Sequence, residues 1–320
     1  LMTELMGANM MRKDGPAHKR ERLAAMPALS MKTARQVWQQ AFEEDCKRLL
    51  DRFEGRECID LVLDFATVLS GMALIRVTGL LDASPQDMDR WSQAMIDGIS
   101  NFAGLPEPAR RCKSALAELD THIEARRRVY ATAPDTSLTS TLMRTDLSPE
   151  AQTANVRLAI SGGQNEARDV IAGAIWALLS HPEQLDLALS AQVSWAQVFA
   201  EYVRWMAPIG MSPRRIAQSF DYGEGRFVPG SKAMLMFGIA NRDPAVFQDP
   251  HRFDLTRDAS RHMAFGAGPH FCAGAWVSKT LIAEVALPLF FDRFPKAKLA
   301  SEPQLWGWAF RGPKTFGVYL

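Results

Sequence analysis

A single cysteine stands in a glycine-rich stretch that could present its sulfur for chemistry. Residues 265–274 read Phe-Gly-Ala-Gly-Pro-His-Phe-Cys-Ala-Gly, and an apolar run with helical spacing follows between Val277 and Leu289. The pattern predicts a tight loop with Cys272 at the N-terminus of a helix. The unpaired N–H groups and the positive end of the helix dipole favour a thiolate over a thiol at such a position.

The spacing of other candidate ligands narrows the role of this thiolate. No second cysteine or histidine lies at the spacing of a zinc site around Cys272. A lone thiolate is better suited to one axial bond to a haem iron. A buried structural cysteine in a turn is the alternative that the cysteine alone leaves open.

A polar cluster interrupts a long predicted helix further upstream. Ser148-Pro149-Glu150 provides an N-cap, a first-turn proline and a first-turn acid, and the helix is expected to run to about Ser180, before His181-Pro182. Its middle, Ser161–Asp169, contains two adjacent glycines, which cost about 1 kcal/mol each relative to alanine. A local conflict of this kind usually marks a functional site.

Glu166 is the residue of this cluster with the clearest chemical use. A partly buried carboxyl has a raised pKa, and in its protonated form it can donate a proton. The alternative is a salt bridge from Glu166 to Arg168 or to a neighbouring helix.

Two further charged pairs have helical spacing. His18 and Arg22, four residues apart after an Asp-Gly-Pro turn, could hold an anion, and a solvated basic helix end is the alternative. Glu201 and Arg204, three residues apart, share a helix face and can form a bidentate ion pair.

The rest of the sequence indicates what must position these groups. The 320 residues, 47% hydrophobic and 23% charged, contain no linker, repeat or low-complexity tract, so residues 1–320 are expected to form a single domain. A net charge of +1 argues against nucleic-acid binding. Four cysteines are too few for a disulfide framework, which favours the cytoplasm, and the lack of an unbroken apolar run of about 18 residues predicts no membrane span.

Hydrophobic periodicity predicts helices over most of the chain. The region from Lys32 to about Ala131 is helical in pattern, with breaks near residues 55, 82–85 and 104–108. Strands are expected around 226–228 and 233–237, and a hairpin over 306–313.

These motifs together resemble the cytochrome P450 monooxygenases, in particular their soluble bacterial members. The stretch around Cys272 is similar to the haem-binding loop of that family. Residues 14–22 are similar to its propionate-binding helix, and residues 201–204 to its Glu-x-x-Arg helix. Residues 240–254 are similar to the segment that leads to the loop. The resemblance implies a mainly α, single triangular haem domain with small β-sheets. It also implies that the N-terminal sheet region of the family is missing, so that the chain is truncated there.

The resemblance further implies a set of haem contacts. Arg214 matches a propionate-binding arginine by its distance from Arg204, whereas Arg215 matches by the Ile-Ala that follows it, and Arg214 is preferred. The implied haem-binding residues are His18, Arg22, Arg214, His262, Phe265, His270, Cys272 and Gly274, with Cys272 as the iron ligand.

The distal helix departs from the usual family pattern. Asn165 takes the place of the acid and Glu166 the place of the threonine in the acid–alcohol pair that normally helps to deliver protons. An amide–acid pair after two glycines resembles the subgroup that includes guaiacol-type aromatic O-demethylases. The implied catalytic residues are Glu166, Asn165 and Gly163, and the implied substrate-pocket residues are Phe102, Gly162 and Phe310.

The activity that this resemblance implies is haem-thiolate monooxygenation with haem b. The expected substrate is a small hydrophobic or methoxylated aromatic compound, O-demethylated or hydroxylated with dioxygen. Electrons are expected from a separate NAD(P)H-dependent flavin or iron–sulfur reductase or a ferredoxin, because the chain has no flavin, nicotinamide or iron–sulfur motif. Two alternatives remain: a peroxide-driven peroxygenase that uses Glu166, and a truncated, inactive haem-binding protein.

Overall fold

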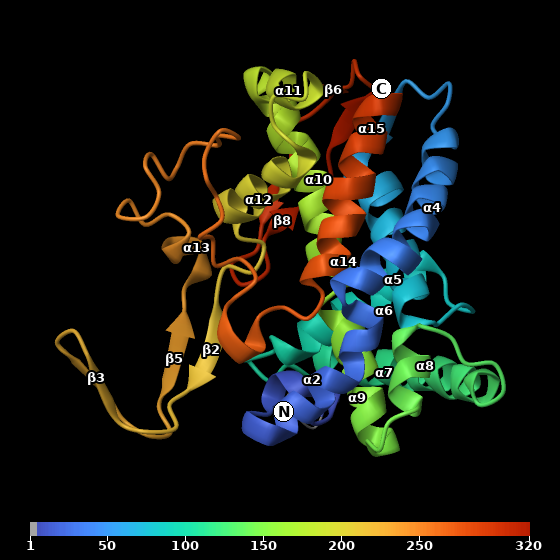
Figure 1. Ribbon diagram of the computed structural model, residues 1–320, viewed down its shortest axis with the longest axis vertical. Coiled ribbons are helices and arrows are strands. Elements are labelled where there is room, and N and C mark those ends of the chain that lie inside the picture. The colour runs from blue at the N-terminus through green and yellow to red at the C-terminus, as the bar shows by residue number, and fades with distance from the viewer. Residues whose placement is uncertain (1–4) are drawn as a thin grey trace.

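Helix α10 (Gln164–Ser180) runs through the middle of the molecule in the computed structural model, which describes residues 5–320 (Figure 1). It packs against α5 (Thr67–Thr78), α6 (Pro85–Ile99), α12 (Trp195–Met206) and the π-helical turn η5 (Thr280–Ala286). Almost all of its side chains are buried. Both ends of this helix are therefore fixed by neighbours that come from distant parts of the sequence.

The other helices surround this centre. The described α-helices besides those four are α2 (Gly15–Leu29), α3 (Met31–Thr33), α4 (Gln39–Asp51), α7 (Pro106–Tyr130), α8 (Leu138–Met143), α9 (Pro149–Ser161), α11 (Pro182–Leu189), α13 (Phe237–Ala240), α14 (Ala275–Lys279) and α15 (Leu287–Arg293). Short 3₁₀ turns are η1 (Met10–Arg12) and η4 (Gly268–His270), and further π-helical turns are η2 (Ala34–Trp38) and η3 (Leu61–Ala66). The mainly α fold class predicted from the sequence is confirmed.

The β-structure is small, and of its strands β8 is buried and packs against α10. One three-stranded antiparallel sheet has the order β1-β9-β6, and three strand pairs are antiparallel as well: β2 with β5, β3 with β4 and β7 with β8. The β3–β4 pair projects away from the helical body (Figure 1). The strands are β1 (Cys58–Asp60), β2 (Ser212–Arg215), β3 (Phe220–Tyr222), β4 (Gly225–Phe227), β5 (Lys232–Leu235), β6 (Lys298–Leu299), β7 (Leu305–Trp306), β8 (Gly312–Pro313) and β9 (Gly317–Tyr319).

Local sequence signals account for several helix starts. The hydroxyl of Ser148 accepts a hydrogen bond from the Ala151 N–H at the start of α9, with Pro149 in the first turn. Ser84 at the start of α6 and Ser194 at the start of α12 each form a complete capping box with the residue three positions later. These helices therefore begin where their own side chains satisfy the free N–H groups.

The single helix predicted over 148–180 is wrong, because the structure divides it into α9 and α10. The helix stops at Ser161 and resumes at Gln164, with Gly162 and Gly163 between them outside helical geometry. The two glycines therefore break the helix, which is the local distortion that the polar cluster suggested. The predicted stop before Pro182 is confirmed.

The predicted strands and hairpin near the C-terminus are present. The segments on either side of Pro229-Gly230 do not pair with each other: β4 pairs with β3, and β5 pairs with β2. The 306–313 hairpin is confirmed by β7 and β8.

One stretch, Leu61–Thr78, is long and apolar enough to cross a membrane by length and composition. It comprises η3 and α5, and 61% of it is buried inside the fold. Asp64 and Arg76 interrupt its apolar run. These features are typical of a core helix.

The predicted pair of Glu201 and Arg204 forms and lies at the base of α12. Both guanidinium–carboxylate contacts are 2.7 Å long, and both side chains are fully buried. The remaining N–H groups of Arg204 donate to the carbonyl oxygens of Asn241, Pro250 and Arg252. The pair thus holds α12 to the loop that leads to Cys272.

We expect Arg204→Ala to destabilise the fold by about 3–5 kcal/mol, because it removes the bidentate partner of the buried Glu201 and leaves only Arg257, whose Nε lies 3.4 Å from Oε1. Urea unfolding measures the loss. Arg128→Ala is the matched control, since the Arg128 side chain is 81% exposed, and should change stability by less than about 0.5 kcal/mol. Equal stability of the two variants would contradict this role.

Candidate active site

The loop that carries Cys272 is held by backbone hydrogen bonds. The Cys272 N–H donates to the Phe265 carbonyl oxygen at 2.9 Å, which closes the loop. Gly266 and Gly268 have φ values of 67° and 66°, in the left-handed region where glycine is favoured. Helix α14 begins directly after Gly274, as the sequence predicts.

The surroundings of the Cys272 sulfur push its pKa in opposite directions. Burial has the largest effect and raises the pKa of the thiol, and the charge of Glu166 raises it further. Hydrogen bonds from the backbone N–H groups of Gly274 and Ala275 and the charge of Arg22 lower it. The N–H groups at the helix N-terminus thus favour the thiolate, as the sequence predicts, but without a bound cation burial outweighs them. A bound cation would favour the thiolate.

Basic side chains gather beside this loop. The rings of His18 and His270 stack with their centroids 4.2 Å apart, and Nε2 of His270 lies 2.9 Å from Oδ1 of Asp14. Burial lowers the pKa of His18 most, and the charges of His270 and Arg22 lower it further. Three predicted haem contacts, His18, Arg22 and His270, are thus brought together, and the charges of Asp14 and Glu21 oppose part of this effect by raising the pKa of His18.

The other predicted haem contacts have separate surroundings. Arg214 is exposed and donates to the Ser212 hydroxyl and the Pro213 carbonyl, and its neighbour Arg215 is exposed as well. Adjacent residues in a strand point to opposite faces, so only one of these arginines can face the basic cluster. The choice of Arg214 stays a prediction.

His262 and Phe265 lie behind the loop. Nδ1 of His262 accepts the Ala264 N–H, and its ring contacts Phe265. Burial lowers the pKa of His262, with a smaller contribution from Arg204. Phe265 also stacks on Phe199 of α12. In this structure both side chains support the loop against α12.

The break between α9 and α10 has a steric cause at one glycine. A Cβ on Gly163 would lie 2.5 Å from the Ala159 carbonyl oxygen and 3.2 Å from Cδ1 of Leu74. A Cβ on Gly162 would meet only the Leu158 carbonyl oxygen at 3.4 Å, an ordinary contact. Gly163 is therefore required by the shape of the break, whereas Gly162 presents an open backbone face.

Glu166 lies in the first turn of α10, directly after this break. One of its carboxylate oxygens, Oε2, is buried and has no hydrogen-bond partner within residues 5–320. Burial raises the pKa of Glu166 to about 7, and the charge of Asp169 raises it further. The alternative salt bridge to Arg168 does not form, because Arg168 is bound to other carboxylates.

Those bonds belong to a buried network that the sequence did not reveal. Nη1 of Arg168 donates to Asp89 of α6 at 3.0 Å, and its Nε donates to Asp169 at 2.9 Å. Asn165 donates to Oε1 of Gln93 at 3.2 Å. Burial raises the pKa of Asp169 to about 6, although Arg168 opposes this shift.

A spacing signal for this network was present in α6. Asp89, Gln93 and Asp97 are each four residues apart and so share one helix face. The predicted catalytic residue Asn165 therefore faces α6, where it fixes the helix beside Glu166.

The two predicted aromatic pocket residues differ in placement. Phe102 is 90% exposed on the loop between α6 and α7, so the structure does not bring it to the interior. Phe310 is half-buried in the β7–β8 hairpin and forms a β-bridge with Ile209. Of the two, Phe310 is the one held by the core of the fold.

The donor set fits a haem better than a metal ion held by side chains. Within residues 5–320 no three His, Cys, Asp or Glu side chains are grouped to hold a metal. The site instead offers one thiol with two backbone donors, a basic cluster of His18, Arg22 and His270 suited to carboxylates, and the unpartnered oxygen of Glu166. Gly274 has open space where its Cβ would be.

Comparison with known proteins agrees with this donor set. A family model described as cytochrome P450 matches residues 195–295, from α12 through the cysteine loop to α15. Cytochrome P450 107B1 of Saccharopolyspora erythraea is 30% identical over 313 residues, which cover 95% of this chain and 74% of that protein. The chain belongs to the cytochrome P450 family.

Other members of the family support the fold over the whole chain. The 6-deoxyerythronolide B hydroxylase of the same organism is 30% identical over 298 residues, covering 91% of this chain and 72% of that protein. A solved structure of P450BioI in complex with an acyl carrier protein ligated to hexadec-9Z-enoic acid has a TM-score of 0.90 at 26% identity. That comparison covers 100% of this chain and 83% of the solved one.

This P450 is therefore a monooxygenase that uses haem b and electrons from an external redox partner. When bound, the haem supplies the iron at which dioxygen is reduced and one oxygen atom is transferred to the substrate. Cys272 would ligate the iron, and His18, Arg22 and His270 would hold the propionates. The substrates named for the relatives are diverse, so the family alone does not specify this one.

We expect Gly163→Ala to cost about 1–3 kcal/mol of stability, because the new methyl group would overlap the Ala159 carbonyl oxygen. Urea unfolding measures this loss, and the Soret absorbance of the haem-loaded protein reports the altered distal side. Gly162→Ala is the matched control and should change neither the stability nor the Soret absorbance by more than the experimental error. An unchanged Gly163→Ala protein would show that the break does not depend on this glycine.

Proposed function

We propose that this P450 O-demethylates a small methoxylated aromatic compound and that Glu166 carries the protons for this reaction. The observation that carries the proposal is the half-buried Glu166, whose carboxyl has one buried, unpartnered oxygen and a pKa of about 7. It stands directly after the Gly162-Gly163 break, in the motif that resembles aromatic O-demethylases. A group with this pKa can both hold and release a proton near neutral pH.

The chemistry of the proposed reaction is balanced by dioxygen and two electrons. One oxygen atom enters a C–H bond of the methoxy group, and the other leaves as water after taking up two protons and the two electrons. The resulting hemiacetal breaks its C–O bond to give a phenol and formaldehyde. A separate flavin or iron–sulfur reductase, or a ferredoxin, would deliver the electrons.

The remaining residues take supporting roles in this proposal. Gly163 permits the break, Asn165 holds α10 to α6, and Glu166 keeps its proton on the distal side. Phe310 lies on a hairpin held by the core and would contact the substrate, with Gly162 leaving room opposite. Phe102 would act only at the outer surface, given its exposure. We also propose a cytoplasmic location, where reduced pyridine nucleotides are available.

The test is a screen of small aromatic ethers against the haem-loaded protein. A substrate should shift the Soret band and release formaldehyde in the presence of a reductase and NAD(P)H. Guaiacol and anisole carry the methoxy group, whereas phenol is the matched control without it. Cys272→Ser should abolish the red-shifted Soret band of the reduced carbon monoxide complex. Haem binding with no spectral shift on any aromatic ether would instead support an inactive haem-binding protein.

A peroxide-driven reaction is the second candidate function, and the same carboxyl favours it. In this reaction Glu166 would accept a proton from hydrogen peroxide, and the protein would need no reductase. The two functions make opposite demands on Glu166. Proton delivery needs the protonated acid, whereas peroxide activation needs the carboxylate.

We therefore expect the pH dependence to distinguish the two functions. Because the pKa of Glu166 is about 7, its proton is present below pH 7 and lost above it. The reductase-driven rate should fall as pH rises through 7, whereas a peroxide-driven rate should rise. Glu166→Gln should lower the rate of whichever reaction the protein catalyses by about 100-fold. It should also remove the change of that rate around pH 7.

Glu166→Asp is the control, since it keeps the carboxyl and should retain part of the rate. Formaldehyde release under each condition is the measurement. A Glu166→Gln protein with the wild-type rate and pH profile would contradict both functions of this carboxyl.

A further inference from the structure

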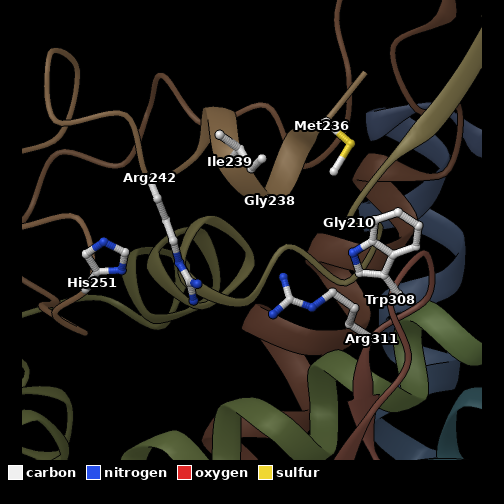
Figure 2. A pocket seen from close by; sticks show the side chains of 8 residues that line it. All are labelled: Gly210, Met236, Gly238, Ile239, Arg242, His251, Trp308 and Arg311. Atoms are coloured by element: carbon white, nitrogen blue, oxygen red, sulfur yellow. The ribbon is translucent and has the colours of Figure 1, made fainter. Parts of the chain in front are cut away.

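A cavity lies between α13 and the β7–β8 hairpin, and it is separate from the candidate active site. Its volume is about 440 Å³, within the range of small-molecule sites. Figure 2 shows the side chains that surround it. The lining residues are Gly210, Met236, Gly238, Ile239, Arg242, His251, Trp308 and Arg311. None of them is a residue of the haem site or the distal helix.

Two arginines face the same space in this cavity. Figure 2 shows the guanidinium groups of Arg242 and Arg311 approaching each other below Gly238, with His251 on the far side of Arg242. A Cβ on Gly238 would lie 3.1 Å from Nη1 of Arg311, so the guanidinium lies directly against this backbone. The absence of a side chain at Gly238 makes room for it.

These cations lack a carboxylate partner. Arg242 donates to the Trp205 carbonyl oxygen, and within residues 5–320 the side chains of Arg311 and His251 form no hydrogen bond or ion pair. No Asp or Glu is among the lining residues in the described part of the chain. The nearby Arg204 is already neutralised by Glu201.

The positive charges of Arg242 and Arg311 repel each other when no counter-ion is present. Burial lowers the pKa of Arg242 most, and the charges of Arg311 and Arg204 lower it further. A cavity lined by charges of one sign concentrates the field and attracts the opposite charge. Guanidinium groups bind carboxylates and phosphates through paired N–H donors. The charges of Arg242 and Arg311 therefore suit an anion.

The rest of the lining is apolar. Met236 and Ile239 form one part of the wall, and the indole of Trp308, which is 70% exposed, lies beside Arg311 (Figure 2). An indole face can stack on a planar ring, and its N–H can donate a hydrogen bond. An inorganic ion would leave this apolar wall unused.

We propose that this cavity binds a small organic anion, an aromatic carboxylate or phosphate monoester, through Arg311 and Arg242. The acidic group lies between the two guanidiniums, and the ring lies against Trp308 and Met236. This site does not depend on the proposed demethylation. It is near the hairpin of Phe310, because the Arg311 N–H donates to the Pro208 carbonyl and the Gly210 N–H donates to the Ala309 carbonyl.

The test is calorimetric titration of the haem-loaded protein with phenyl phosphate, benzoate and phenol. Phenyl phosphate or benzoate should bind with one-to-one stoichiometry. The compound with the higher affinity shows whether the site prefers a phosphate or a carboxylate. Phenol has the ring without the charge and should bind at least about tenfold more weakly. Equal heats for phenol and for both acids would overturn the proposal.

Variants then locate the binding. Arg311→Gln should weaken binding by about tenfold or more, and Trp308→Ala should weaken it without loss of the fold, because Trp308 is exposed. Arg311→Lys keeps the charge and should recover part of the affinity. Arg226→Gln makes the same change of charge on the exposed β4 strand and should have no effect.

The urea midpoint of each variant separates a lost site from a lost fold. Binding that survives in both Arg311→Gln and Arg242→Gln would place the ligand elsewhere and overturn the proposal. No heat from either acid at about 10 mM, far above a specific affinity, would do the same.

Discussion

The position of the Cys272 sulfur depends on one backbone contact, the hydrogen bond from the Cys272 N–H to the Phe265 carbonyl oxygen. It closes a loop whose turns need glycine at two left-handed positions, and it points the N–H groups of Gly274 and Ala275 at the sulfur. Behind the loop, Phe265 stacks on α12, and the buried ion pair of that helix binds the carbonyl groups of the preceding segment. A ligand atom placed by backbone and packing in this way does not need a neighbouring side chain to hold it.

The distal side is built on the opposite principle, because it depends on side chains that cross between helices. The break at Gly163 frees the first turn of α10 from α9, and the contacts of Arg168 and Asn165 with α6 then fix that turn. Glu166 takes no part in these contacts, and its Oε2 has no hydrogen-bond partner within residues 5–320. Because Arg168 is shared by Asp89 and Asp169, little of its charge is left to lower the pKa of Glu166. Burial remains the main reason why the pKa of this carboxyl is raised to about 7.

Much of the fold could be predicted because local chemistry determines it. The caps at Ser148, the stop at Pro182 and the loop around Cys272 all follow from neighbouring residues, and their resemblance to one family supplied the arrangement. Contacts between segments that are distant in the sequence could not be predicted from neighbouring residues. Asp89, a partner of Arg168, is 79 positions away, and neither the burial of Cys272 nor the exposure of Phe102 follows from the neighbouring residues in the sequence. Spacing reveals which residues share a face, but not which face meets which.

Charge compensation distinguishes the three polar regions of this P450. At the base of α12, each charge of the Glu201–Arg204 pair meets its partner, which is why it serves stability. Beside Cys272, the basic cluster faces the exposed Asp14 and also Glu21, which already pairs with Lys13, and the two propionates of a haem would add further negative charge there. At Arg242 and Arg311 two positive charges lie close together, and no Asp or Glu of the described residues lines their cavity. Charges that are removed from water without a partner are unfavourable. We therefore expect an anion to stabilise the cavity of Arg242 and Arg311, as the haem propionates would stabilise the basic cluster beside Cys272.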